Sequence, residues 1–353
     1  MFKINKVEPA NFYMDKVMAD LQSFALKARG DIESRFESSR RAKDKTSQDV
    51  NLDKRKDLEL EKIRYINEKL HNLVKDIIKR FPNFKKVDKI YLRLVDTSDV
   101  KVAEIEDALK RLLWITNTID EYTQNTEVKI KHSKSQQTVS FIMKKYLGRV
   151  NSLFRKNKDF FVKLEMSRQF MNRLPTFLEV YTVAIGGYPN VGKSTLLKKI
   201  TGSNVEIQNY PFTTKGLMFG YLESNGKKEI QFIDTPGLLG REKSNPIEQR
   251  AEIVLNEYSD FIVFVLDLTK SSGYSVKSQI RLLKQTLEIG KPLIIYLSKT
   301  DIYDEDAEME QEEIKSVLKK HKTFTDALEL KEYVLTQKFS VNKFDVRKIN
   351  TIK

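Results

Sequence analysis

Residues 187–194 read Gly-Tyr-Pro-Asn-Val-Gly-Lys-Ser, which fits the GxxxxGKS/T pattern of a phosphate-binding loop. The apolar run Tyr181–Ile185 directly precedes this stretch, and the helical pattern Leu196–Ile200 follows it. This order predicts a strand, a glycine-rich turn and the start of a helix. Backbone N–H groups of such a turn bind anions, and the helix end adds about half a positive charge. We therefore expect a bound triphosphate, with Lys193 at its β- and γ-phosphates and the Ser194 hydroxyl on Mg²⁺.

A second motif, Asp-Thr-Pro-Gly at residues 234–237, ends a short apolar-rich strand pattern and begins 41 positions after Lys193. A carboxylate at the carboxyl end of that strand can hold the metal through water, which is the role expected for Asp234. The N–H of Gly237 is expected to contact the γ-phosphate.

The stretch between these two motifs, Asn209–Lys215, contains Thr213 and Thr214. A threonine in this interval closes onto Mg²⁺ and the γ-phosphate when a triphosphate is bound. We favour Thr214, because it lies immediately before the next strand. Beyond it, Asn225-Gly226 separates two strand-like runs, which predicts an antiparallel hairpin at the edge of an otherwise parallel sheet.

A third motif, Ser298-Lys299-Thr300-Asp301, follows the apolar run Pro292–Leu297. The Asp301 carboxylate can accept hydrogen bonds from both N1–H and N2–H₂ of guanine, and adenine offers neither arrangement. Because this motif comes third in the order, after a buried strand, it predicts GTP and GDP as ligands and disfavours ATP.

The phosphate loop, Tyr-Pro-Phe-Thr-Thr at residues 210–214 and Asp-Thr-Pro-Gly at residues 234–237 together resemble the Obg-related translation-factor GTPases. One further segment makes the resemblance more specific. Residues 267–279 read Asp-Leu-Thr-Lys-Ser-Ser-Gly-Tyr-Ser-Val-Lys-Ser-Gln. They resemble the segment after the fourth strand in the nucleolar GTP-binding protein (Nog) family of large-subunit ribosome assembly factors.

Upstream, Lys145–Arg149, the region of Arg168, Arg173–Pro175 and Phe81-Pro82 resemble the helical N-terminal domain of the same family. The resemblance covers about residues 60 to 353. The chain ends at Lys353, whereas eukaryotic relatives carry a long C-terminal extension, which suggests a short, archaeal type of the family.

The chain departs from the family's pattern at several positions. Ser298 stands where the family has asparagine, and the last guanine-binding loop would be Ser340-Val341-Asn342. Leu238 stands where many GTPases keep a water-orienting glutamine, so the intrinsic rate of hydrolysis is expected to be slow. Obg-like relatives with asparagine in the phosphate loop bind K⁺, which implies Asn190 as a K⁺ ligand, with a loop-stabilising amide as the alternative.

The resulting site has three sets of residues. The expected catalytic residues are Lys193, Thr214 and Gly237. The expected Mg²⁺ ligands are Ser194, Thr214 and Asp234. The expected nucleotide-binding residues are Gly187, Tyr188, Pro189, Asn190, Val191, Gly192, Lys193, Ser194, Thr195, Asp234, Thr235, Pro236, Gly237, Ser298, Lys299, Asp301, Ser340 and Val341.

Positive charge is concentrated in the first half of the chain. Residues 1–175 carry 38 Lys and Arg against 25 Asp and Glu, whereas residues 176–353 carry nearly equal numbers and the whole chain has a net charge of +14. Residues 129–173 alone carry twelve basic and two acidic side chains. A segregated basic face is typical of proteins that bind RNA phosphates, although a solvated face is the alternative.

The first half also reads as helices. Apolar residues repeat at intervals of three and four in residues 63–81, 105–119, 139–154 and 160–170, and Pro82 ends the first stripe. Residues 38–57 are highly charged and are expected to form a mobile or an exposed helical connection, and residues 126–137 a polar break. The predicted fold is α plus α/β: a basic helical bundle at residues 1–175, then a P-loop GTPase domain with a mostly parallel, doubly wound sheet at 176–353.

The chain has no cysteine, no long apolar run and no signal-peptide core at its start, so we expect a cytoplasmic protein without a membrane partner. The expected function is that of a GTP-hydrolysing switch in large ribosomal subunit assembly. Its partners would be the large subunit or its precursor, rRNA and ribosomal proteins. The alternatives are an Obg-like stress or growth signalling GTPase that does not need rRNA, and a scaffold GTPase that self-assembles or binds membranes.

Overall fold

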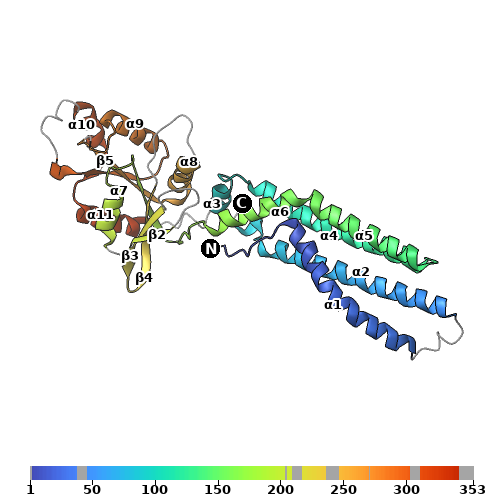
Figure 1. The fold of residues 1–353 in the computed structure, drawn as a ribbon. Helices are drawn as coiled ribbons and strands as arrows, with labels where there is room; N and C mark the ends of the chain where they lie inside the picture. Colours follow the sequence, from blue (N-terminus) through green and yellow to red (C-terminus); the bar gives the residue numbers. More distant parts are fainter. Residues whose placement is uncertain are drawn as a thin grey trace. The chain divides into compact units, whose positions relative to one another are not determined.

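A computed structural model describes residues 2–37, 46–202, 205–208, 217–235, 246–269, 271–302 and 311–341. Contacts divide the chain into two compact units, which are described separately. The helical unit comprises residues 2–87 and 99–172, and the sheet unit comprises residues 88–98 and 173–353. Figure 1 shows both units with their labels.

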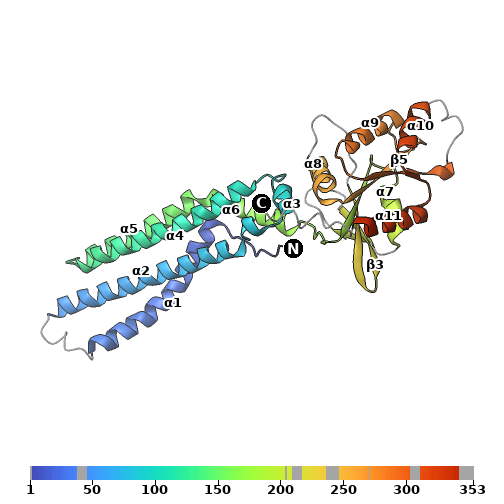
Figure 2. The same cartoon turned by 180° about the vertical axis from the view of Figure 1, so that it is seen from behind.

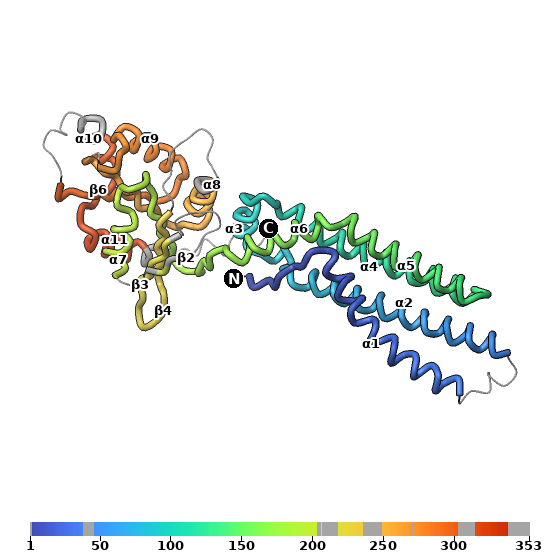
Figure 3. The backbone as a smooth tube through the Cα atoms, viewed as in Figure 1, coloured from blue at the N-terminus to red at the C-terminus, as the bar shows by residue number. Residues whose placement is uncertain are grey.

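The helical unit consists of long helices joined by short connections. In chain order they are α1 (Ala10–Glu37), α2 (Ser47–Arg80), the short η2 (Phe84–Lys86), α4 (Val102–Lys131), α5 (Gln136–Lys156) and α6 (Lys158–Asn172). Helix α2 packs against α1 and α4, and α4 packs against α5 and α6. The tube in Figure 3 shows α4 and α5 running side by side.

The core of the helical unit comes from the predicted apolar stripes. Ile63, Leu70, Leu112, Val150 and Leu164 are all fully buried. Burying one such side chain contributes about 1.5–3 kcal/mol, so the stripes on four helices supply a large favourable term that opposes the entropy cost of folding.

Residues 47–57 of the predicted connection are helical, which is one of its two expected forms, and residues 38–45 lie outside the described residues. Residues 47–57 form the first turns of α2, which Thr46 caps by accepting from the Asp49 N–H. The polar break is shorter than expected, because α4 continues to Lys131 and α5 begins at Gln136. Helix α1 was not singled out in the sequence, although its buried residues Tyr13, Val17, Leu21, Ala28 and Ile32 recur at intervals of four and seven.

The sheet unit is a seven-stranded sheet with strand order β2-β3-β4-β1-β5-β6-β7. Strands β4, β1, β5, β6 and β7 are parallel, and β2 and β3 add antiparallel pairs. The strands are β1 (Tyr181–Gly186), β2 (Val205–Gln208), β3 (Leu217–Ser224), β4 (Lys227–Asp234), β5 (Phe261–Asp267), β6 (Leu293–Ser298) and β7 (Thr323–Phe324). This confirms the predicted mostly parallel, doubly wound sheet.

Helices cover both faces of this sheet. Helices α7 (Lys193–Thr201) and α11 (Ala327–Val341) pack against each other on one face. Helices α8 (Pro246–Ile253), α9 (Val276–Leu287) and α10 (Gln311–Lys320) lie on the other face, as Figures 1 and 2 show from opposite sides. The π-helical turn η3 (Val254–Tyr258) leads into β5, and the 3₁₀ turn η4 (Thr300–Ile302) follows β6.

The predicted hairpin is present, with Asn225 and Gly226 both at positive φ between β3 and β4. Its position at the sheet edge is wrong, however, because β2 pairs with β3 and forms the edge. Strand β2 has only four residues, too few for its alternation to be recognised in the sequence.

Residues 88–98, which the sequence placed in the bundle, pack within the sheet unit instead. They include helix α3 (Lys89–Val95), where the Tyr91 hydroxyl accepts a hydrogen bond from the Phe177 N–H at 3.1 Å. Buried Arg250 donates through Nε to the Thr97 hydroxyl at 2.7 Å. These contacts join residues far apart in sequence, so periodicity alone could not indicate them. Among the described helices, none is long and apolar enough to cross a membrane.

Candidate functional site

The phosphate loop lies between β1 and α7, as predicted. Gly187 has φ 136°, and a Cβ at this position would approach the Val265 carbonyl oxygen to 2.7 Å. Gly192 has φ 101° and caps α7, and Asn190 has φ 61°. Because these positive φ angles turn the backbone sharply before the helix, the loop can direct its N–H groups at an anion.

Lys193 and Ser194 are the first two residues of α7. The Lys193 side chain is only 7% exposed, and its Nζ donates to the Tyr188 carbonyl oxygen at 2.7 Å, so the ammonium group is held over the loop. The Ser194 hydroxyl donates to Oδ2 of Asp234 at 2.5 Å. Two residues that are 40 positions apart thus meet at the start of the helix.

Sheet register explains this meeting. Strands β1 and β4 are parallel neighbours, and Ile185 of β1 is paired with Asp234 of β4. Asp234 therefore lies beside the end of β1, from which the phosphate loop departs. A hydroxyl and a carboxylate at one point are hard oxygen ligands of the kind Mg²⁺ prefers, and Mg²⁺ needs few protein ligands because it keeps waters and phosphate oxygens. Among the described residues, no group of three or more His, Cys, Asp or Glu side chains is placed to hold a metal ion.

Thr235, which the sequence predicts to bind the nucleotide, makes a contact within the sheet. Its hydroxyl donates to the Ile185 carbonyl oxygen at 2.8 Å, and the side chain is fully buried. It therefore joins β4 to β1. Pro189, Asn190 and Thr195 lie on the loop and the first turn of α7, where they are at least partly exposed.

The base-recognition motif also lies at the carboxyl end of the sheet. The Ser298 hydroxyl is buried and lies 2.5 Å from the Val191 carbonyl oxygen and 3.1 Å from that of Leu266. A serine hydroxyl has one proton, so it donates to one of these two main-chain oxygens. Ser298 thus ties β6 to the phosphate loop. Asp301 lies in η4 and is exposed.

A polar cluster at the end of β5 holds the next residue, Lys299. Its Nζ donates to Oδ2 of fully buried Asp267 at 2.8 Å and to the Ser271 hydroxyl at 2.7 Å, and Lys299 has φ 57°. Asp267 also accepts from the N–H and hydroxyl of Thr269 and from the Ser272 N–H. Burial would raise the pKa of Asp267, but the hydrogen bonds from Lys299 and Thr269 outweigh it and lower the pKa to about 2.

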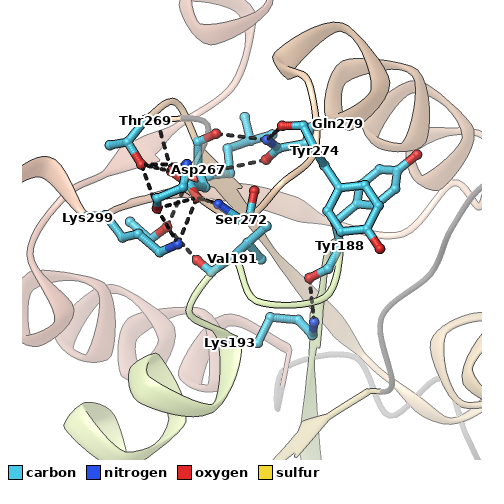
Figure 4. Close-up of polar contacts among 12 residues, drawn as sticks. Tyr188, Val191, Lys193, Asp267, Thr269, Ser272, Tyr274, Gln279 and Lys299 are labelled. Atoms are coloured by element: carbon cyan, nitrogen blue, oxygen red, sulfur yellow. Dashed lines mark hydrogen bonds and ion pairs between the residues drawn. The ribbon is translucent and has the colours of Figure 1, made fainter. Parts of the chain in front are cut away.

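The same segment reaches the phosphate loop through Tyr274, whose ring packs on Tyr188 with centroids 4.5 Å apart. Gln279 fixes the segment, because its amide bonds the backbone of Asp267 and the Tyr274 carbonyl oxygen. Figure 4 shows Tyr188, Lys193, Lys299 and this network together. In the sequence, residues 267–279 were noted only because they resemble a segment of the Nog family, and this network was not predicted. The Asp-x-Thr-x-Ser pattern, typical of side chains that bond a local turn, was the available signal.

Ser340 and Val341, which the sequence predicts for the last guanine-binding loop, lie at the end of a helix in this structure. Both belong to the last turn of α11, which begins after β7 and runs back along the sheet. β7 is parallel to β6, with Thr323 and Phe324 paired to Ile295 and Tyr296. The loop beside Ser298 is therefore formed by Thr325 and Asp326, and Asp326 caps α11 by accepting from the Leu328 and Glu329 N–H groups.

Several predicted residues lie outside the described residues: Thr213, Thr214, Pro236, Gly237, Leu238 and Asn342. In the helical unit, ten of the twelve basic residues of segment 129–173 are exposed. The exceptions are Lys163 and Arg168, which are half-buried and pair with Glu104 at 2.6 Å and Glu165 at 2.8 Å.

Comparison with known proteins gives matches to both units. Residues 182–299 match the family described as 50S ribosome-binding GTPase, and residues 25–177 match the family described as the NOG1 N-terminal helical domain. The uncharacterized protein MJ1408 of Methanocaldococcus jannaschii is 34% identical over 252 residues, which cover 70% of each chain.

Nucleolar GTP-binding protein 1 of Candida glabrata is 32% identical over 248 residues, covering 69% of this chain and 38% of that protein. The chain thus spans about two fifths of the length of that nucleolar relative. A solved structure of nucleolar GTP-binding protein 1 from Plasmodium falciparum overlaps with a TM-score of 0.38 at 24% identity, covering 50% of this chain and 96% of that one.

Proposed function

The chain belongs to the nucleolar GTP-binding protein family, and on that premise we propose that it is a GTP-hydrolysing switch for assembly of the large ribosomal subunit. The observation that carries this proposal is the hydrogen bond from the Ser194 hydroxyl to Oδ2 of Asp234, which is 2.5 Å long and lies at the start of α7. It supplies a metal site next to a loop built for phosphates. The names of the relatives, nucleolar and 50S ribosome-binding, support the choice of partner.

In the proposed reaction, the phosphate loop binds the triphosphate and Lys193 neutralises its charge. Mg²⁺ held by Ser194 and, through water, by Asp234 would stabilise charge on the phosphate oxygens during hydrolysis. Thr214 and Gly237 would close onto the γ-phosphate and release it after hydrolysis. We further propose that hydrolysis is slow without a partner, because Leu238 cannot orient water, and that Asn190 holds K⁺. The protein would act in the cytoplasm.

We propose that guanine is recognised mainly through Asp301. The neighbouring side chains of the motif already have protein partners: Ser298 bonds main-chain oxygens, and Lys299 bonds Asp267. Thr325, exposed after β7, would complete the pocket on the other side of the base.

A nucleotide lacking the purine N7 should therefore bind as well as the natural one. N7 is an acceptor, and the single proton of Ser298 is already donated to a main-chain oxygen. We expect 7-deaza-GDP and GDP to have dissociation constants within about twofold, measured by calorimetry in Mg²⁺. Inosine diphosphate, which lacks the N2 amino group, is the control and should bind more weakly. Weaker binding of 7-deaza-GDP than of inosine diphosphate would refute this assignment.

For the ribosomal partner, we propose that the exposed basic residues of α5 bind rRNA phosphates. Lys144, Lys145 and Arg149 lie within about one and a half turns of the helix and are all exposed, and only Arg149 has a described contact, with its guanidinium 5.8 Å from the ring of Tyr122. Exposed side chains without acidic partners can move to meet phosphate oxygens at little cost.

Reversing these three charges to glutamate should weaken association with large ribosomal subunits at least about tenfold at physiological salt, since phosphate contacts dominate such affinities. Affinity for GTP should stay unchanged. Sedimentation with purified subunits over a salt series measures the effect, and the matched control reverses Lys198, Lys199 and Lys277, which are exposed on the sheet unit. Equal losses in both triple variants would contradict the proposal.

Cosedimentation also tests the switch itself. Subunit binding should be stronger with a non-hydrolysable GTP analogue than with GDP. If the protein binds GTP but sediments with subunits identically under both conditions, the signalling alternative that does not need rRNA would replace this proposal.

A further inference from the structure

A cavity of about 400 Å³ lies in the helical unit, and Gln136 is its one lining residue from the basic segment 129–173. It is formed by the second half of α1, the first half of α2 and the first residue of α5. Its lining residues are Arg29, Ile32, Glu33, Asn51, Lys54, Arg55, Leu58 and Gln136. The volume falls in the range of roughly 300–1,000 Å³ that is typical of sites for small organic groups.

The lining combines an apolar floor with a charged rim. Ile32 and Leu58 are buried and belong to a small apolar cluster between α1 and α2, which Phe24 and Phe36 extend. The rim has three cations and one carboxylate, so its formal charge is +2. Two carboxamides, those of Asn51 and Gln136, are exposed at the same rim and can each donate and accept hydrogen bonds.

One cation of the rim, Arg55, is held in place by the buried carboxylate of Glu59. Arg55 Nη2 lies 2.9 Å from a carboxylate oxygen of Glu59 and donates to the Ser140 hydroxyl at 3.3 Å. Glu59 is 0% exposed and also pairs with Lys62 at 2.8 Å. A carboxylate is rarely buried completely unless it is paired, so this arrangement fixes Arg55 on α2 and across to α5.

The other two cations have no carboxylate partner among the described residues. Lys54 lies 5.8 Å from the centre of the Phe36 ring, which is a weak contact, and Arg29 is exposed. Both are long side chains that can reach a ligand in the cavity. The site therefore offers one fixed and two adjustable positive charges around an apolar surface.

The geometry points to a binding site for a single unstacked nucleotide of RNA. The base would enter the cavity above Ile32 and Leu58, which are 2% and 8% exposed, with its polar edge at Asn51 and Gln136, and the flanking phosphates would contact Arg29, Lys54 and Arg55. Proteins read RNA mainly at such splayed nucleotides, because the edges of paired bases are inaccessible in duplex RNA. This inference rests on the RNA-binding role proposed above and adds a site that is separate from the basic face of α5.

The test compares two double variants of the whole protein. Arg29→Ala with Lys54→Ala removes the adjustable charges and leaves Arg55, Glu59 and the buried cluster intact. Lys27→Ala with Lys75→Ala is the matched control, because it removes two exposed charges from the same helices outside the cavity. The probe is a fluorescent single-stranded RNA of mixed sequence, and its duplex with the complementary strand is measured in parallel.

We expect the cavity variant to bind the single strand about tenfold more weakly and the control about twofold or less, with duplex binding reduced equally in both. The wild-type protein carrying single-stranded RNA with 4-thiouridine should crosslink within residues 29–58. Equal losses of single-strand affinity in the two variants, or crosslinks confined to residues 144–173, would overturn the site. Competition by a poly-glutamate peptide as effective as by unlabelled RNA would overturn RNA as its ligand.

A free nucleotide could present the same chemistry. Protection of the crosslink by millimolar uridine or adenosine monophosphate alone would assign the site to free nucleotides and overturn the RNA assignment. Failure of this site is distinguishable from failure of the proposed function, because loss of subunit binding in the α5 charge-reversal variant would persist.

Discussion

Lys193→Ala is expected to abolish tight binding of GTP and GDP. The lysine is nearly buried and its ammonium group is held over the phosphate loop by the Tyr188 carbonyl oxygen. It would make charge-assisted hydrogen bonds to two phosphates, each contributing about 1.5–3 kcal/mol. Losing both should weaken affinity about a hundredfold or more, which titration calorimetry can measure.

A matched control separates this loss from damage to the fold. Lys198 is exposed on the same helix, so Lys198→Ala removes an equal charge without touching the loop. Thermal unfolding of both variants shows whether the domain is intact. If folded Lys193→Ala protein bound GTP within a few fold of wild type, the phosphate loop would not be the nucleotide site.

The sequence predicted the phosphate-loop region well because several local signals coincide there. The buried run of β1, the glycines that permit positive φ at 187 and 192, and the helical pattern of α7 each indicate the same order. The hairpin at Asn225-Gly226 is similar, since its turn chemistry is local. Such features need no knowledge of distant contacts.

The features that the sequence did not indicate depend on contacts between residues far apart in the chain. Asp267 and Lys299 are 32 positions apart and meet only because β5 and β6 are neighbours, with Asp267 paired to Ser298. The two-residue strand β7 has no readable pattern, so the sequence did not indicate the loop that follows it. The cavity in the helical unit likewise depends on the packing of three helices.

Asp301→Asn should change the preferred base from guanine to xanthine. Asp301 is exposed at the carboxyl end of the sheet, and its carboxylate is expected to accept from guanine N1–H and N2–H₂. A carboxamide can still accept from N1–H, but its NH₂ group faces the N2 amino group, and two donors cannot bond. Xanthine has a carbonyl oxygen at that position, so the carboxamide matches it.

We expect the affinity of the variant for GDP to fall about a hundredfold, since two charge-assisted hydrogen bonds are affected, while xanthosine diphosphate gains affinity over wild type. Calorimetry with both nucleotides, in the same Mg²⁺ buffer, gives the ratio. Glu288→Gln removes an exposed carboxylate at the far end of α9 and should leave the ratio unchanged. Retained guanine preference in Asp301→Asn would mean that another group reads the base, and Thr325 and Asp326 in the loop after β7 would then be the residues to change.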